Sequence, residues 1–125
     1  MKGLAALIAI LLMPSAVSAQ EAQICRFETI CSGTTACEPA EPDATILIRT
    51  TGDTAAITIE DKTVTARRVD TQHSDPETYF GAEPDTGGTM MVSVFADGTG
   101  IASLQGNLFG PFAVTLFGTC SAVAE

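Results

Sequence analysis

Apolar and polar residues alternate along most of the chain after residue 43. Ile46 and Ile48 fall on one side of this pattern, as do Ile57 and Ile59, and the surrounding positions are rich in Thr and Val. These residue types suit a pleated, half-buried surface, so the pattern predicts β-strands. The alternating segments are 44–50, 54–60, 62–69, 89–96, 99–106 and 112–120, and Tyr79 with Phe80 forms a short strand inside the polar stretch 71–88.

Short turn segments separate these strands. Residues 51–53 and 60–61 suit tight hairpins, and Asp97-Gly98 is the clearest hairpin signal in the chain. No segment after residue 19 places apolar residues at the i, i+3, i+4, i+7 spacing of a helix. The sequence therefore predicts an all-β fold, a small antiparallel β-barrel or β-sandwich of about seven to eight strands, and the consecutive hairpins favour the barrel.

The first nineteen residues have the features of an export signal. Lys2 gives a positive start, Leu4–Met13 is a short apolar run, and Pro14 ends it. The small residues of "VSA" at 17–19 then offer a cleavage site before Gln20. About ten apolar residues are too few for a membrane-spanning helix, which needs about twenty. We expect residues 1–19 to be a cleaved signal peptide of bacterial type and residues 20–125 to be a single β domain, periplasmic or secreted, without membrane insertion after cleavage.

The exported part of the chain is strongly acidic. Without Lys2 it has five basic and fifteen acidic residues, a net charge of −10. Such a chain repels nucleic acid and anionic membrane surfaces, and it offers no basic stripe that would bind either. The charge favours solubility, and it also favours attraction to a basic partner.

Four cysteines in an exported chain predict disulfides, which would hold the β domain together. Three of them lie close together in "CRFETICSGTTAC", residues 25–37, and the fourth is Cys120. Neither the C-x-x-C spacing of redox centres nor the close pairs of structural zinc sites occur, and no metal site is expected. The segment between Cys31 and Cys37 can turn back on itself, which leaves Cys25 for Cys120; a Cys37–Cys120 bond is the main alternative.

No catalytic residues, metal or cofactor are predicted. In "HSDPE", residues 73–77, the His, Ser and Asp are adjacent and point apart, so they do not form a triad. The carboxylates of the two acidic stretches, which include Glu41, Asp43 and Glu77, lack the ordered spacing of a calcium loop. Met90 and Met91 are expected to be strand residues rather than copper ligands.

Three residues are candidates for binding a partner: Leu108, Phe109 and Tyr79. The first two lie in "NLFGPF", residues 107–112, an apolar turn region. If this loop projects, it is an apolar knob for a partner; we expect instead that it folds inward and caps the barrel. Tyr79 is the only tyrosine, and the chain has no tryptophan.

In outline, a small exported β domain with a cystine joining its two ends resembles the periplasmic inhibitors of C-type lysozyme. That family carries a Ser-Gly-x-x-Tyr motif on an inhibitory loop. The nearest stretch here, "SDPETYFG" at 74–81, lacks the glycine and the spacing. The resemblance therefore implies an inhibitor-like binding function and transfers no site residue.

The sequence predicts a non-catalytic, periplasmic or secreted binding protein whose partner is a basic protein. Two alternatives stay open: a barrel that binds a small molecule or lipid, which needs inward residues too small to fill the interior, and a structural accessory subunit of an envelope assembly. The partner's identity and the oligomeric state are left open.

The export signal makes a direct prediction. The mature protein should begin at Gln20, because small residues occupy positions −3 and −1 before it. N-terminal sequencing or the intact mass of the periplasmic protein checks this. Recovery of the chain with Met1 in a membrane fraction would contradict it.

Overall fold

The computed structural model describes residues 21–33, 36–69, 75–84, 87–107 and 109–123. The expected signal peptide, residues 1–19, lies outside these ranges. The described residues form nine strands: β1 (Glu21–Ser32), β2 (Glu38–Pro39), β3 (Thr45–Thr51), β4 (Thr54–Ile59), β5 (Lys62–Arg68), β6 (Glu77–Glu83), β7 (Gly88–Val94), β8 (Thr99–Asn107) and β9 (Pro111–Ala122).

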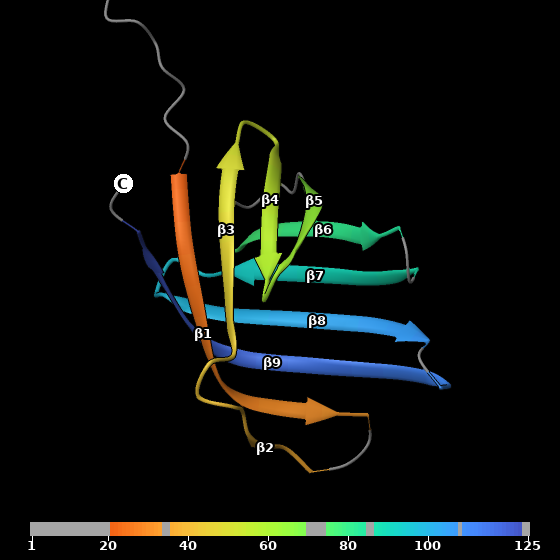
Figure 1. Cartoon of the computed structure of the whole chain (residues 1–125). Helices are drawn as coiled ribbons and strands as arrows, with labels where there is room; N and C mark the ends of the chain where they lie inside the picture. The colour runs from red at the N-terminus through yellow and green to blue at the C-terminus, as the bar shows by residue number, and fades with distance from the viewer. Residues whose placement is uncertain (1–20, 34–35, 70–74, 85–86, 108, 124–125) are drawn as a thin grey trace, which may run out of the picture.

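The strands form one antiparallel sheet that closes into a barrel. Each strand from β3 to β9 pairs with the next one in sequence, and β1 pairs with both β3 and β9. In Figure 1, β3, β4 and β5 run vertically and β6 to β9 run across them. Eight strands close the barrel, and β2 is an extra strand on β1. The all-β prediction and the preference for a barrel are confirmed, and the sandwich alternative is wrong.

A bulge in β1 adjusts the closing strand pair. The register passes from Phe27 opposite Gly118 to Thr29 opposite Phe117, so Glu28 is an extra residue. The bulge reverses the alternation of faces, and Ile30 therefore lies opposite the partly buried Leu116 after the bulge. A side chain at Gly118 would collide with the backbone of β1, so the close approach of the two strands requires glycine there.

Inward-facing side chains fill the barrel. Tyr79, Ile46, Ile48, Ile57 and Val92 are the largest fully buried side chains, and they belong to one continuous core cluster. No charged or polar residue is buried among those that the structure describes. Met90 and Val92 face the core while Met91 is exposed, as the alternation predicted.

Both predicted disulfides are present. Cys25 and Cys120 lie directly opposite each other on β1 and β9, the pair that closes the barrel, and Cys31 is bonded to Cys37 beside β2. The prediction of this pairing is confirmed, and the Cys37–Cys120 alternative is wrong. A side chain at Gly100 on β8 would collide with the Cys120 sulfur, so glycine makes room for the bond. Two disulfides and no free cysteine are consistent with an oxidising extracellular or periplasmic compartment.

The two bonds should differ in their contribution to stability. Cys25–Cys120 closes a loop with a sequence separation of 95, against 6 for Cys31–Cys37. On the chain-entropy model the first contributes about 4–5 kcal/mol and the second about 2–3 kcal/mol. Replacing Cys25 and Cys120 together by Ala should therefore lower the urea midpoint of unfolding more than replacing Cys31 and Cys37. Equal or reversed losses would contradict this ordering.

Candidate functional site

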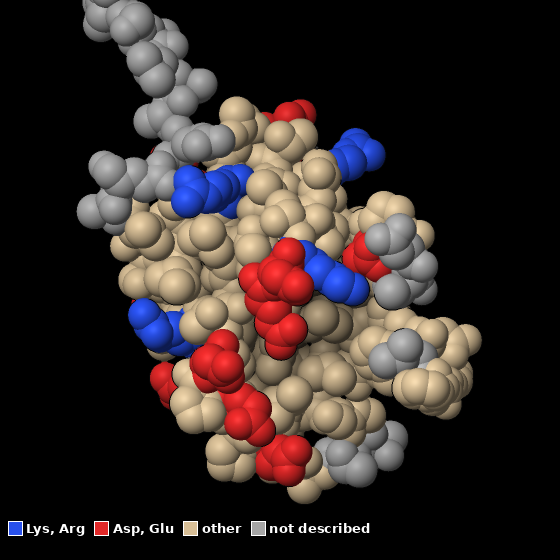
Figure 2. Space-filling model, in the orientation of Figure 1, with Lys and Arg blue, Asp and Glu red and all other residues tan. Residues whose placement is uncertain are grey.

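An apolar recess with an acidic rim lies at one end of the barrel. Glu41, Asp43 and Glu60, all exposed, are among the residues that line it, and its volume is about 210 Å³. We call this site the acidic recess. The apolar side chains that line it are Phe27, Ile30, Ile46, Ile59, Leu104 and Leu116. Figure 2 shows acidic side chains in a line from the centre of the visible face to its lower edge.

Two chain segments place the carboxylates. The connection from β2 to β3 carries Glu41 and Asp43; it is tied to β1 by hydrogen bonds from Ala40 N to Glu28 O and from Phe27 N to Ala44 O, both 2.9 Å. Glu60 is the first residue of the two-residue turn between β4 and β5. Segments that are distant in sequence therefore meet at one rim.

Glu60 has an unusual backbone conformation. Its φ is 55°, in the left-handed region that favours glycine. For a residue with a side chain this conformation costs about 1–2 kcal/mol. The turn would be more stable with glycine, so the glutamate is retained at a cost to the stability of the fold. Strain of this kind often accompanies functional residues.

The chemistry of the acidic recess suits a lysine or arginine side chain. The apolar lining can pack against the methylene groups of such a side chain, and the carboxylates can bind its charged end. Within the described part of the chain, no hydrogen bond or ion pair engages the carboxylates of Glu41, Asp43 and Glu60. They therefore need not give up a partner in this chain to bind a cation.

A neighbouring recess of about 290 Å³ has mixed charge. It shares Ile59, Glu60 and Leu104 with the acidic recess and adds Lys62 and Glu83. It opens where β5 and β6 separate, since these strands pair at only three positions, Ala66–Arg68 with Tyr79–Gly81. The lysine makes this recess less suited to a cation than the acidic recess.

The turn between β8 and β9 displays Phe109. The exposed fraction of this side chain is 104%, and its φ of 63° is again in the left-handed region. The turn is stabilised by a hydrogen bond of 3.2 Å from Gly110 N to the side-chain oxygen of Asn107. The expectation that this loop folds inward and caps the barrel is therefore wrong for Phe109. Leu108 lies outside the described residues.

Tyr79 is not on the surface. Its side chain is fully buried. Its hydroxyl accepts a hydrogen bond from Thr50 Oγ1 (3.1 Å) and donates one to Glu77 Oε2 (3.1 Å). Glu77 in turn forms an ion pair with Arg68 at 3.6 Å. Burial raises the pKa of Tyr79 above its ordinary 10.0; the nearby Glu77 adds to the rise, while the bond from Thr50 and the charge of Arg68 oppose it. With its ring in the core, Tyr79 offers no surface contact, and Phe109 is the exposed one of these two candidates.

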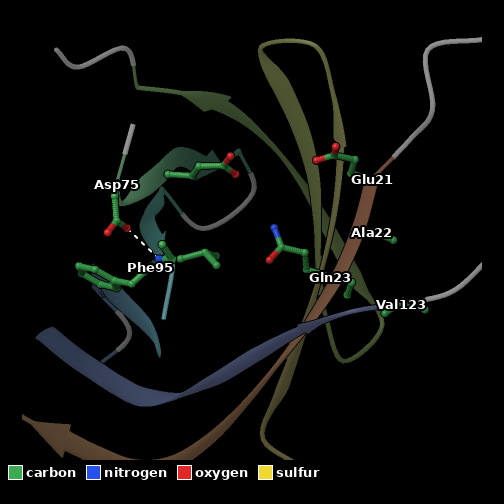
Figure 3. A pocket seen from close by; sticks show the side chains of 10 residues that line it. Glu21, Ala22, Gln23, Asp75, Phe95 and Val123 are labelled. Atoms are coloured by element: carbon green, nitrogen blue, oxygen red, sulfur yellow. Dashed lines mark hydrogen bonds between the residues drawn. The ribbon is translucent and has the colours of Figure 1, made fainter. Parts of the chain in front are cut away.

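A wider cleft of about 680 Å³ lies between the start of β6 and the beginning of β1 (Figure 3). It brings Glu21, Asp75 and Glu77 together, but the latter two have partners in the chain. Asp75 Oδ1 accepts a hydrogen bond of 2.8 Å from Ala96 N, drawn as a dashed line, and Glu77 is held by Tyr79 and Arg68. These carboxylates stabilise the fold locally, and the acidic recess is the stronger site for a cation.

The two acidic stretches of the sequence do not converge. Glu41 and Asp43 line the acidic recess, whereas Asp75 and Glu77 line the cleft at the start of β6. In the described ranges, no three His, Cys, Asp or Glu side chains gather as a possible metal site. His73 lies outside those ranges. None of the described segments forms a helix long and apolar enough to cross a membrane.

Comparison with protein-family models, with curated proteins and with solved structures finds no match for this chain. Its function is therefore inferred from its own residues. The sequence pointed to Phe109 and to the acidic charge, but it missed Glu60. The only signal for it was a turn of two acidic residues with no glycine or asparagine, types that ordinarily occupy the left-handed positions of such hairpins.

The buried phenol offers a pH test. Tyr79 is the only tyrosine and the chain has no tryptophan, so phenolate absorbance reports this side chain alone. We expect its titration midpoint above 10, because burial disfavours the charged form. Because the pKa of Tyr79 is raised in the folded state, the neutral phenol contributes fully to the free energy of unfolding below the pKa of the unfolded chain. This contribution is lost as the pH rises through the pKa of the folded protein. The free energy of unfolding should therefore fall above pH 10.

The matched variant is Tyr79→Phe, which removes the hydroxyl and keeps the ring. It should abolish this alkaline loss and cost about 1 kcal/mol at neutral pH. A phenol that titrates at or below its ordinary pKa in the folded protein would contradict the buried placement.

Proposed function

We propose that this protein is an exported, non-catalytic binding protein that engages a basic protein. In this proposal the acidic recess receives a lysine or arginine side chain of the partner, and Phe109 packs against an apolar area of it. The observation that carries the proposal is the acidic recess itself, which three acidic residues line together with apolar side chains. A recess of this composition favours long cationic side chains over anionic or purely apolar ligands.

The backbone supports the same two contact points. Glu60 and Phe109 are the only residues other than glycine with a positive φ in the described ranges. Glycine at either position would relieve strain, so both side chains occur where they lower stability. Such a cost is expected at residues that serve binding rather than folding.

The net charge and the compartment also fit. The described residues include twelve acidic and five basic side chains, a balance that draws a cationic partner toward the protein. The disulfides are consistent with export, and we propose that residues 1–19 direct the chain to the periplasm or the medium. The filled interior disfavours the alternative of a barrel with a lipid or small molecule at its centre.

Binding to two basic probes tests the proposal. The probes are an arginine-rich peptide and a C-type lysozyme, which is chosen because the chain resembles the inhibitors of that enzyme in outline. A glutamate-rich peptide is the control. Isothermal titration should detect the basic probes and not the acidic one. Affinity should fall as salt rises, because the Debye length is about 10 Å at 0.1 M and shortens further above it. Failure of both basic probes would count against a basic partner.

Matched variants locate the site. Glu60→Gln and Asp53→Asn each remove one negative charge, but Asp53 lies in the β3–β4 turn at the other end of β4. Glu60→Gln should weaken binding about fivefold or more, and Asp53→Asn less than about twofold. Equal losses would indicate a general charge effect and contradict a site at the recess.

A third variant separates binding from folding. Glu60→Gly should weaken binding while raising the free energy of unfolding by about 1 kcal/mol, because glycine adopts the left-handed conformation without strain. The urea midpoint measures the second effect. A destabilised Glu60→Gly protein would show that the glutamate serves the fold.

A further inference from the structure

The outer face of the β6–β9 half of the barrel carries no charge. Alternation and register assign seventeen residues to it, all within the described ranges. None is Asp, Glu, Lys or Arg. They are Thr78, Phe80, Ala82, Thr89, Met91, Ser93, Thr99, Ile101, Ser103, Gln105, Asn107, Pro111, Ala113, Thr115, Phe117, Thr119 and Ser121. An uncharged face of four strands is unusual on a chain with a net charge of −9.

Large apolar side chains cross this uncharged face. Phe80 lies directly opposite Met91, and Ile101 lies directly opposite Phe117. Met91 pairs with Ser103, so Ile101 is its diagonal neighbour and the two pairs form one stripe. The exposed fractions of Phe80, Met91 and Phe117 are 44%, 45% and 40%. Aromatic residues and methionine with few charges are typical of the centre of a protein interface.

One pair of polar side chains beside the stripe, and the backbone of its strands, are already hydrogen-bonded. Thr78 and Ser93 form a hydrogen bond of 2.9 Å between their side-chain oxygens across β6 and β7. The backbone of these strands is already paired within the sheet. Covering the uncharged face would therefore not break these bonds, while its other hydroxyl and amide side chains would need partners across the interface.

The charge distribution indicates what covers this face. The other strands turn Arg26, Arg49 and Arg67 outward. Of the twelve described carboxylates, seven lie in turns and connections and five in strands, and none is on the uncharged face. Two copies of so acidic a protein repel each other wherever their carboxylates come close. The outward positions of β3 to β5 carry no carboxylate either, but Arg49 and Arg67 lie there. The uncharged face is therefore the broad surface on which two copies meet without opposing like charges. A second copy therefore fits it better than a charged partner does.

We propose that the uncharged face joins two copies of this chain in a symmetric dimer. The stripe of Phe80, Met91, Ile101 and Phe117 would pack against the same stripe of the second copy, as in the packing of two sheets. Four strands of this length present about 500 Å² in projection. Stable interfaces bury about 800 Å² per partner, so the dimer is weak and forms at micromolar or higher concentration.

The dimer contact and the acidic recess use opposite sides of the same strands. Leu104 and Leu116 face inward and line the recess, whereas Ile101 and Phe117 face outward. Dimerisation therefore leaves the recess open, and the inference does not rest on the proposed function. The two contacts also differ in their response to salt: screening weakens the binding of a basic partner, but it strengthens the association of two acidic copies.

Sedimentation velocity of the purified protein tests the inference. The protein concentration should run from about 5 µM to about 1 mM, the range in which weak interfaces associate. The mass should rise from one copy toward two, and it should rise at lower concentration as salt increases. Met91→Glu should move the midpoint of association to at least tenfold higher concentration. The matched control, Thr65→Glu, adds the same charge to an exposed outward position of β5 and should move it less than twofold.

Phe117→Ser is a second variant, which adds no charge and is needed because Met91 is partly buried and its replacement could affect folding. Circular dichroism and the urea midpoint of unfolding show whether each variant is folded. A folded Phe117→Ser protein should also associate at least tenfold more weakly. A protein that stays a single copy at 1 mM and high salt, or an association equally weakened by Thr65→Glu, would overturn the dimer. Association that salt weakens would show contact through charged surfaces instead.

Discussion

The pairing of β1 with β9 is the interaction on which the rest of the structure depends. Without it the sheet would have two long edges, and the inward side chains of the eight strands would face water rather than one another. The pair is adapted to this role at several positions: Glu28 forms the bulge, Gly118 permits close approach, and the Cys25–Cys120 bond joins two residues in register. The chain thus secures covalently the one strand pair that links its two ends.

Closure of the barrel also separates the acidic recess from the uncharged face. Every strand turns alternate residues toward the core and toward solvent, so β8 and β9 contribute to two surfaces at once. Leu104 and Leu116 reach the acidic recess at the barrel end, while Ile101 and Phe117 cross the uncharged face. None of the outward positions on that face is occupied by a carboxylate. The contacts that we propose with a cationic ligand and with a second copy would therefore use surfaces that do not overlap.

The turns carry the features that the strands cannot. A strand fixes the direction of its side chains, whereas a turn can project one outward at the expense of backbone strain. Glu60 and Phe109 both have left-handed backbone conformations, and one contributes a carboxylate to the recess while the other is fully exposed. Their shared conformation connects two features that are distant in sequence and differ in chemistry. Strain at these two positions is explained if the side chains bind a partner.

The sequence by itself determined the all-β class and the inward and outward residues of most strands, and it favoured the disulfide pairing that the structure shows. These properties depend on local alternation and on cysteine spacing, which a single chain displays directly. It did not determine the bulge at Glu28, which depends on how β1 and β9 meet, or the direction in which Phe109 points, which depends on the Asn107 turn. Only the tertiary structure brought Glu41, Asp43 and Glu60 to one rim and aligned the apolar stripe across four strands. Both arrangements depend on register between segments that are distant in sequence, and register is settled only when the barrel closes.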